Sequence, residues 1–146
     1  MRKVVTDDQE FLRLWISKAL GGDAPKDMQL IGQEIDGEIK AVAGYSAFEG
    51  KACNFSLAGD GGNWMNKDFL WAMFDYPFNK LNLKVIIATI AGSNYKSLKL
   101  SRNLGFKQIA NIADAHQDGD LVIMIMRREN CKWLHIDAKL KKDLGA

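Results

Sequence analysis

The sequence predicts a single α/β (α+β) domain in which a mostly antiparallel sheet of six or seven strands is flanked by three or four helices. Three observations lead to this expectation. Strand-like and helix-like segments follow each other in the order strand, helix, three strands, helix, strand, helix, two strands. Short turn signals join most neighbouring strands directly, which favours antiparallel pairing. Only the strands at 52–58 and 83–90 have a helix between them, so only this pair is expected to run parallel.

Composition and charge narrow the class of protein. The chain has 146 residues, 47% of them hydrophobic, and a net charge of +2, which predicts one ordinary core and no strong attraction to nucleic acid. Its apolar runs are too short to cross a bilayer, and its first residues lack the apolar stretch of a signal peptide, so we expect a cytoplasmic protein. The two His and two Cys show no metal-ligand spacing, and we expect both Cys to be buried and unpaired.

The first half of the chain predicts a strand, a helix and three strands. Thr6 is suited to cap the helix, and Gln9 stands three residues further on, as in a capping box. Asp36-Gly37 is a strong signal for a two-residue hairpin turn. The elements expected here are a strand at 1–5, a helix from 6 to about 21, and strands at 28–35, 39–48 and 52–58.

The second half predicts a helix, a central strand, a further helix and a hairpin. Pro77 should disturb the last turn of the first of these helices. The strand at 83–90 is rich in Val and Ile and apolar on both faces, as expected of a strand in the middle of a sheet. Asn94 is a good N-cap and Gly105 a good C-terminal residue for the next helix. The elements expected here are a helix at 66–79, a strand at 83–90, a helix at 94–104, strands at 106–114 and 121–126, and a helical tail at 129–146.

One stretch carries a family resemblance. Residues 83–106, LKVIIATIAGSNYKSLKLSRNLGF, consist of a buried strand, a loop with Asn94, and a helix closed by Gly105-Phe106. This unit resembles the second cofactor-binding motif of the GNAT superfamily of acyl-CoA N-acetyltransferases, and the resemblance extends from about Val42 to Trp133. It implies the GNAT fold, in which the two parallel strands splay apart and acetyl-CoA lies between them. It also implies direct transfer of the acetyl group to a primary amine in a ternary complex, with acetyl-CoA as donor and an amine-bearing small molecule or protein as acceptor.

The resemblance further implies a set of cofactor-binding residues. Strand backbone would hydrogen-bond the pantetheine arm, and amides at the start of the helix after the glycine-rich segment would hold the pyrophosphate. Asn94 either contacts the cofactor or only caps its helix, and helical spacing puts Ser97 and Ser101 on one face of that helix. The residues expected to bind the cofactor are Phe55, Leu57, Ala58, Gly62, Asn63, Trp64, Lys67, Asn94 and Ser97.

Three residues are candidates for the chemistry. Ser101 stands where many members of the family carry a Tyr that protonates the leaving thiolate, although a small residue there would also pack the helix on the sheet. Glu34 and His116 are the candidates for a general base that deprotonates the amine, because both lie on or next to strands that border the substrate groove of the family. Both also fit solvated surface groups. A backbone amide near Leu57 would hold the oxyanion.

A second hypothesis is a non-catalytic GNAT-like protein, encoded by a phage or associated with a virion, that has no cofactor site. The segment from Gly62 to Lys67 lacks the second and third glycines of the phosphate loop of the family, and a glycine-rich hairpin turn would also explain it. The chain as a whole also resembles GNAT-like proteins of bacteriophages and bacteria. A homodimer is a further expectation, because Trp133 and the apolar tail are suited to pack on a second subunit.

Overall fold

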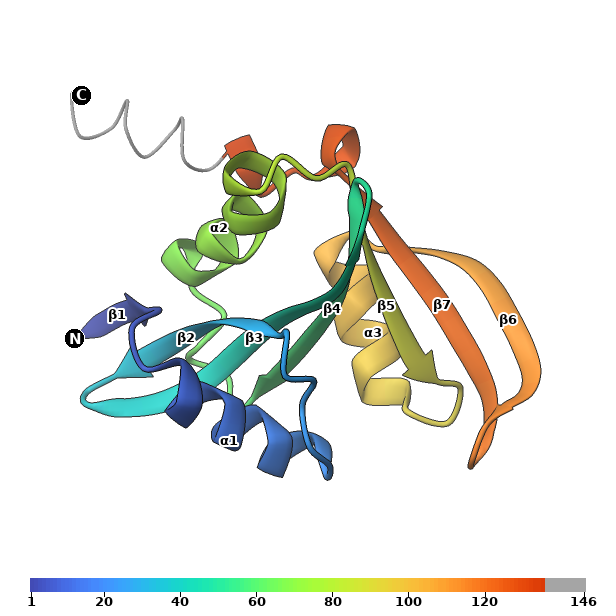
Figure 1. Ribbon diagram of the computed structural model, residues 1–146, viewed down its shortest axis with the longest axis horizontal. Coiled ribbons are helices and arrows are strands. Elements are labelled where there is room, and N and C mark those ends of the chain that lie inside the picture. The colour runs from blue at the N-terminus through green and yellow to red at the C-terminus, as the bar shows by residue number, and fades with distance from the viewer. Residues whose placement is uncertain (136–146) are drawn as a thin grey trace.

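The computed structural model describes residues 1–135, which form one seven-stranded sheet with helices on both faces (Figure 1). The strand order is β1-β2-β3-β4-β5-β7-β6, and every neighbouring pair is antiparallel except β4 and β5. The predicted fold class and the single parallel pair are therefore confirmed. The strands are β1 (Arg2–Val5), β2 (Gln29–Ile35), β3 (Glu38–Glu49), β4 (Ala52–Gly59), β5 (Val85–Ala91), β6 (Lys107–His116) and β7 (Gly119–Arg127).

The α-helices in the described part of the chain are α1 (Gln9–Leu20), α2 (Lys67–Asp75) and α3 (Tyr95–Leu104). None of them is long and apolar enough to span a membrane. Short helical turns follow α2 at Tyr76–Lys80 and β7 at Arg128–Asn130. Of the helical tail expected at 129–146, residues 136–146 lie outside the described part of the chain.

The start of α1 differs from the expectation. Asp8, not Thr6, is the N-cap, and its Oδ1 accepts a hydrogen bond from the amide of Phe11 at 3.1 Å. The side chain of Gln9 bridges to β2 instead of completing a capping box. Its Nε2 donates to the carbonyl of Leu30 at 2.8 Å, and its Oε1 accepts from the Leu30 amide at 2.9 Å. Register pairing of β1 with β2 covers only Gly32 to Ile35, so Gln9 satisfies strand backbone that β1 does not reach.

The sequence signals for the Asp36-Gly37 turn, for the two ends of α3 and for the disturbance at Pro77 are confirmed. Asp36 and Gly37 have φ values of 50° and 86°, as a type I′ hairpin turn requires. Asn94 caps α3, and Gly105 ends it in the left-handed conformation with φ 109°. Pro77 does disturb the end of its helix, because the chain widens there into a π-turn.

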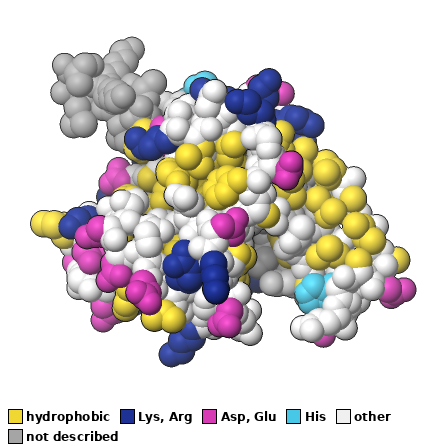
Figure 2. Space-filling view, viewed as in Figure 1, with side chains coloured by type: hydrophobic (Ala, Val, Ile, Leu, Met, Phe, Trp, Pro, Cys, Tyr) yellow, Lys and Arg dark blue, Asp and Glu magenta, His cyan; other side chains and the backbone are white. Residues whose placement is uncertain are grey.

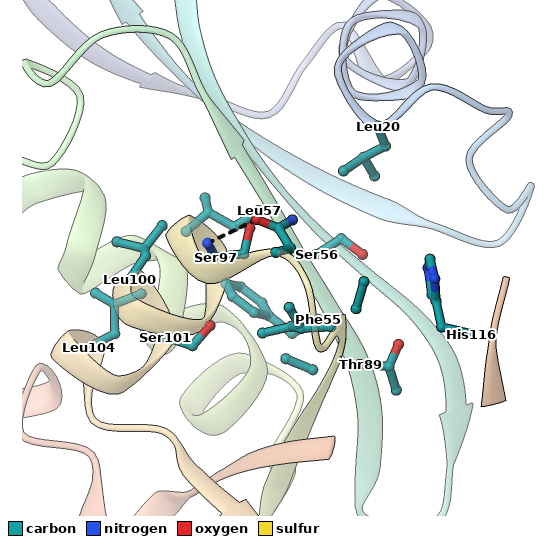
Figure 3. Close-up of a pocket in the computed structure, with 14 residues that line it drawn as sticks. Leu20, Phe55, Ser56, Leu57, Thr89, Ser97, Leu100, Ser101, Leu104 and His116 are labelled. Carbon is teal, nitrogen blue, oxygen red and sulfur yellow. Dashed lines mark hydrogen bonds between the residues drawn. The ribbon is translucent and has the colours of Figure 1, made fainter. Parts of the chain in front are cut away.

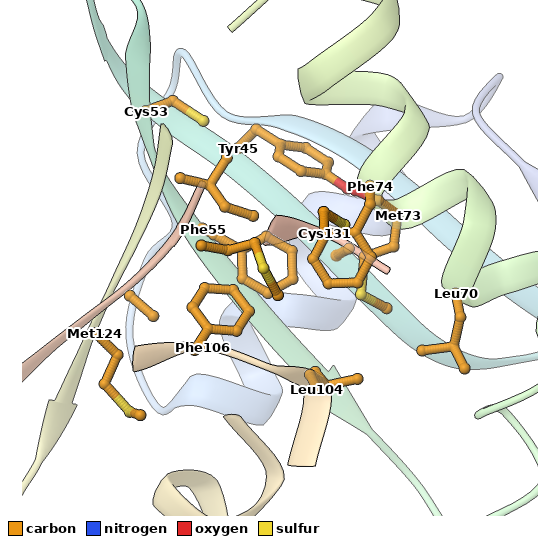
Figure 4. Close-up of a cluster of buried hydrophobic side chains, with 14 of the residues drawn as sticks. Tyr45, Cys53, Phe55, Leu70, Met73, Phe74, Leu104, Phe106, Met124 and Cys131 are labelled. Carbon is orange, nitrogen blue, oxygen red and sulfur yellow. Dashed lines mark hydrogen bonds between the residues drawn. The ribbon is translucent and has the colours of Figure 1, made fainter. Parts of the chain in front are cut away.

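The core lies mainly between the sheet and the pair α2 and α3. Phe55 of β4 stacks on Phe74 of α2 and Phe106, with ring centroids 6.2 and 5.7 Å apart (Figure 4). The hydroxyl of Tyr45 donates to the carbonyl of Met73, and burial raises the pKa of this phenol well above its usual value. A smaller cluster lies on the other face, where Leu12 and Ile16 of α1 pack over β2 and β3. On this second face the cluster reaches β4 only at Ala58.

We expect both thiols to be unreactive in the folded protein. Cys53 and Cys131 are buried and unpaired, and burial raises the pKa of each thiol to about 11. At pH 8 only about 0.1% of each would be thiolate, against roughly a quarter of a free cysteine. Ellman's reagent should therefore label neither thiol within minutes in buffer and both in guanidinium chloride. Rapid labelling of the native protein would contradict this.

Candidate functional site

The parallel strands β4 and β5 separate partway along their length. Their register pairs Ala52 with Val85, Cys53 with Ile86 and Asn54 with Ile87, and it ends there. Both strands continue, β4 to Gly59 and β5 to Ala91, so their carboxyl-terminal halves splay apart (Figure 1). Within residues 1–135, the backbone of β4 beyond Asn54 has no partner strand on this side. Such a strand edge offers unpaired amide and carbonyl groups to an extended ligand.

A cavity of about 220 Å³ lies where the strands separate, between them and α3 (Figure 3). Phe55 and Leu57 of β4 and Ile90 of β5 line one side. The face of α3 that carries Ser97 and Ser101 lines the other, as the helical spacing predicts. The cavity is thus apolar at its base and carries two hydroxyl groups on its helical wall.

Asn94 also lines this cavity and is exposed. Its Oδ1 accepts a hydrogen bond from the Ser97 amide at 3.2 Å, drawn as a dashed line in Figure 3. Among the described residues, its Nδ2 has no partner. The two roles considered for Asn94 are therefore compatible, because the oxygen caps α3 while the amide nitrogen stays free to donate to a ligand.

His116, at the end of β6, reaches the same cavity from the opposite side (Figure 3). Its side chain is 29% exposed, and its Nδ1 accepts a hydrogen bond from the Asp118 amide at 3.1 Å. A neutral ring held in this way carries its hydrogen on Nε2. The carboxylate of Asp118 lies 3.9 Å from the same Nδ1 and offers an acceptor for the other tautomer.

A second hollow, of about 350 Å³, lies across the splayed strands on the side of α1. The loop from Leu20 to Pro25 forms its outer wall, and Ser56 and Thr89 lie at its border with the first cavity, since they line both. In the described part of the chain, Asp23 is the one charged residue that lines it. The two hollows meet between the strands, so ligands entering from opposite sides can touch.

The sequence did not single out Ser56, Thr89 and Asp23. A signal existed for Thr89, which is the one polar side chain in the strand VIIATIA. Side chains alternate across a strand, so Ser56 and Thr89 point away from the core side on which Phe55 and Ala88 lie. Recognising them as site residues requires knowing that the two strands separate beside them.

Several expected site residues lie elsewhere. Glu34 lines a separate hollow between α1 and the β2–β3 hairpin, with Asp7 and Trp15 as neighbours, and it does not meet Ser101 or His116. Ala58 packs against the α1 cluster. Gly62, Asn63 and Lys67 are exposed and do not line the cavity.

Trp64 is a core residue. Its side chain is 5% exposed, its indole nitrogen donates to the Gly61 carbonyl at 2.8 Å, and its ring meets Phe69 edge to face. The ring also covers Gly59 closely. Its size and apolar character explain why it turns inward, and it does not line the cavity between the strands.

Comparison with solved structures shows the fold. A chimera of spermidine N-acetyltransferase SpeG from Vibrio cholerae and hSSAT matches 91% of this chain and 98% of its own, with a TM-score of 0.71 and 14% identity. The protein yncA from Salmonella typhimurium, solved with its cofactor acetyl-CoA, matches 86% of this chain and 93% of its own, with a TM-score of 0.68 and 14% identity. The chain therefore has the GNAT fold, as predicted. No family model and no curated protein matches the sequence.

Proposed function

We propose that the protein is an acetyl-CoA-dependent N-acetyltransferase that transfers the acetyl group to a primary amine by direct attack in a ternary complex. The observation that carries this proposal is the separation of β4 and β5 after Asn54 and Ile87, beside the capped start of α3. The splayed edge suits the amides of a pantetheine arm, and the start of α2, the helix that joins the two strands, suits the pyrophosphate. Support also comes from the fold shared with yncA, which was solved with acetyl-CoA.

The residues of the cavity fit this cofactor. The backbone of Phe55 and Leu57 would pair with the arm, Asn94 Nδ2 would donate near the phosphates, and the Ser97 hydroxyl lies on the same wall. The cofactor supplies an activated thioester. A backbone amide near Leu57 would hold the oxyanion that forms when the amine attacks. The amine would reach the thioester from the hollow beside Ser56 and Thr89.

Two side chains would handle protons. Ser101 lies on the cavity wall, and its hydroxyl is a weak acid, but a thiol with a pKa of about 8.5 leaves readily as thiolate. His116 would take the proton of the amine through Nε2. For that step the ring has to carry its own hydrogen on Nδ1, where the nearby carboxylate of Asp118 would accept it. Glu34 is left out of the proposal, because it lies in a different hollow.

Calorimetric titration of the full chain with acetyl-CoA tests the proposal. We expect a dissociation constant between about 1 µM and 1 mM, the range in which substrates of enzymes usually act. Asn94→Ser should weaken binding by about 1–3 kcal/mol, since Ser removes the free amide donor but still caps α3. The melting temperature should change little, which separates the lost contact from a lost cap. Absence of binding at millimolar acetyl-CoA would contradict the proposal.

One observation favours the alternative of a non-catalytic protein. The indole of Trp64 is anchored on the glycine-rich segment, and Asp68 places a carboxylate in the first turn of α2, where a phosphate would need positive charge. If these groups exclude the pyrophosphate, the same titration shows no heat of binding. The two hypotheses therefore predict opposite results from one measurement.

A further inference from the structure

The hollow on the side of α1 has a polar floor. Figure 2 shows the surface hollowed between the end of α1 and the β6–β7 hairpin. Neutral hydrogen-bonding side chains from three neighbouring strands line this hollow, and we call them the polar floor: Ser46, Asn54, Ser56 and Thr89. The register places Ser46 opposite Asn54, and side chains alternate along each strand, so all four project from one face of the sheet.

The side chains of the polar floor have no hydrogen-bond partner within residues 1–135. Ser46 matters most, because it is only 4% exposed and its hydroxyl is still unpaired in that part of the chain. Buried hydroxyl groups are normally hydrogen-bonded, since an unpaired one costs free energy. Ser46 lines the hollow, so a polar group of a ligand bound there would supply the missing partner.

The outer wall of the hollow is anchored on both sides. The Ser17 hydroxyl on α1 accepts a hydrogen bond from the Ala24 amide at 2.9 Å. Asp27 Oδ2 accepts one from the Ala47 amide of β3 at 3.0 Å. The loop from Leu20 to Pro25 is therefore tied to a helix and to the sheet. A hollow with such a wall is largely formed before a ligand binds, which lowers the entropic cost of binding.

The charges around the hollow disfavour two classes of amine. Among the described residues no Lys, Arg or His lines it, so the carboxylate of an amino acid would find no cation. Asp23 supplies its single carboxylate, which is exposed and forms no salt bridge in the same part of the chain. A polyamine such as spermidine carries two amines besides the one that reacts, and one carboxylate can pair with only one of them. The acceptor therefore carries little charge beyond its reacting amine.

The polar floor in turn disfavours an apolar amine. A hydrocarbon ring laid on it would remove water from four polar side chains and give none of them a hydrogen bond in return. A hydroxyl group both donates and accepts, so it can pair with Ser, Thr or Asn in either sense. The hollow of about 350 Å³ is also at the small end of ligand pockets, which suits a single ring.

We propose that the acetyl acceptor is a small amine with several hydroxyl groups, as in an amino sugar, and that these hydroxyl groups bind the polar floor. This inference rests on the proposed function. An acceptor that arrives protonated first loses one proton to solvent. The amine nitrogen then bonds to the acetyl carbon, the carbon–sulfur bond of the thioester breaks, and CoA leaves as its thiolate. His116, which lies beyond Ser56 and Thr89 in the adjoining cavity, takes the second proton from nitrogen.

Two amines on six-membered rings test the proposal, because D-glucosamine carries hydroxyl groups and cyclohexylamine carries none. Release of CoA from acetyl-CoA is followed with Ellman's reagent, and rates are compared at equal concentrations of free amine. We expect kcat/KM to be at least about 100-fold higher for glucosamine, since a site that hydrogen-bonds hydroxyl groups rejects an analogue without them. Spermidine should be at least about tenfold poorer than glucosamine. Equal or better turnover of either competitor would overturn the proposal.

A binding measurement separates this proposal from the proposed function. The amide resonances of the ¹⁵N-labelled full chain are titrated with D-glucosamine, with and without CoA. Those of the polar floor should shift, and cyclohexylamine at the same concentration should leave them unchanged. If acetyl-CoA fails to bind, the enzymatic function is lost and this titration still tests the hollow. If acetyl-CoA binds but glucosamine shifts no resonance of the floor in either state, the acceptor class alone is wrong.

Substitutions in the floor test its role directly. Ser46→Ala with Asn54→Leu should lower kcat/KM for glucosamine at least about tenfold and leave that for cyclohexylamine equal or higher. Comparing two amines on one variant cancels differences in amine basicity and in cofactor binding. Asn103→Leu is the control: Asn103 is exposed on α3 and lines neither the hollow nor the cavity, so both amines should react as with wild type. A parallel loss for both amines in the floor variant would overturn the proposal.

Discussion

Ser101→Trp should abolish acetyl-CoA binding while the protein remains folded. Ser101 is half-buried on α3 and lines the cavity of about 220 Å³ between the splayed strands. An indole in this position would take up much of that volume and leave no room for a pantetheine arm. We expect binding to weaken at least about 100-fold, which corresponds to about 2.7 kcal/mol or more. Calorimetry measures the loss, and circular dichroism with thermal melting checks the fold.

Lys99→Trp is the matched control for this substitution. Lys99 is exposed and lies two residues earlier on α3, about 200° around the helix axis from Ser101. It therefore adds the same side chain to the same helix outside the cavity, and binding should stay at the wild-type level. If Ser101→Trp binds acetyl-CoA as well as wild type does, the cavity is not the donor site and the proposed function fails with it.

The sequence was a good guide wherever a local rule decides the conformation. Asp36-Gly37 specifies its hairpin because both residues tolerate a positive φ, and Asn94 and Gly105 delimit α3 because each satisfies the backbone at its end. The parallel pair followed from the order of elements, because a helix lies between the two strands and a crossover of this kind joins parallel strands.

The N-cap of α1 is a case that local sequence rules do not decide. Thr6 and Gln9 have the spacing of a capping box, and Asp8, two residues after Thr6, is an equally good N-cap. The choice is made by Leu30, 21 residues away, whose backbone forms two hydrogen bonds with the Gln9 side chain. No pattern around Thr6 contains that information.

The residues of the candidate site also fall into those that a local pattern predicts and those that depend on tertiary packing. Periodicity was sufficient to place Ser97 and Ser101 on one face of α3, and the structure puts that face in the cavity. Glu34 and the hollow beside Thr89 depend on how α1 and its following loop pack across the sheet. That packing is a tertiary property, so the sequence grouped Glu34 with His116 although they line different hollows.

Trp64→Ala should destabilise the protein by about 3–5 kcal/mol, the usual cost of removing a buried Trp. The indole is buried against Phe69 and hydrogen-bonded to Gly61, so its loss leaves a void and removes this hydrogen bond. Urea unfolding followed by circular dichroism measures this cost. If Trp64 instead belonged to an exposed phosphate loop, stability would change little and only ligand binding would suffer.

A substitution at Gly59 also tests the packing of the Trp64 indole, because the ring lies against this glycine. A Cβ at this position would lie 2.2 Å from the Trp64 indole, and no positive φ restricts the residue. Gly59→Ala should therefore cost about 1–3 kcal/mol through the clash alone. Gly62→Ala is the control, since a Cβ there meets nothing within 4 Å and Gly62 likewise has no positive φ.

The double variant Gly59→Ala with Trp64→Ala separates the clash with the indole from any other effect of the added methyl group. Once Trp64 is Ala, the added Cβ of Gly59→Ala has open space, so its cost should fall close to zero. The two substitutions should then show a coupling energy of about 1–3 kcal/mol. Additive costs would mean that the indole does not rest on Gly59 in solution. The glycine-rich segment would then be free to approach a phosphate, and Trp64 would return to the candidates for the cofactor site.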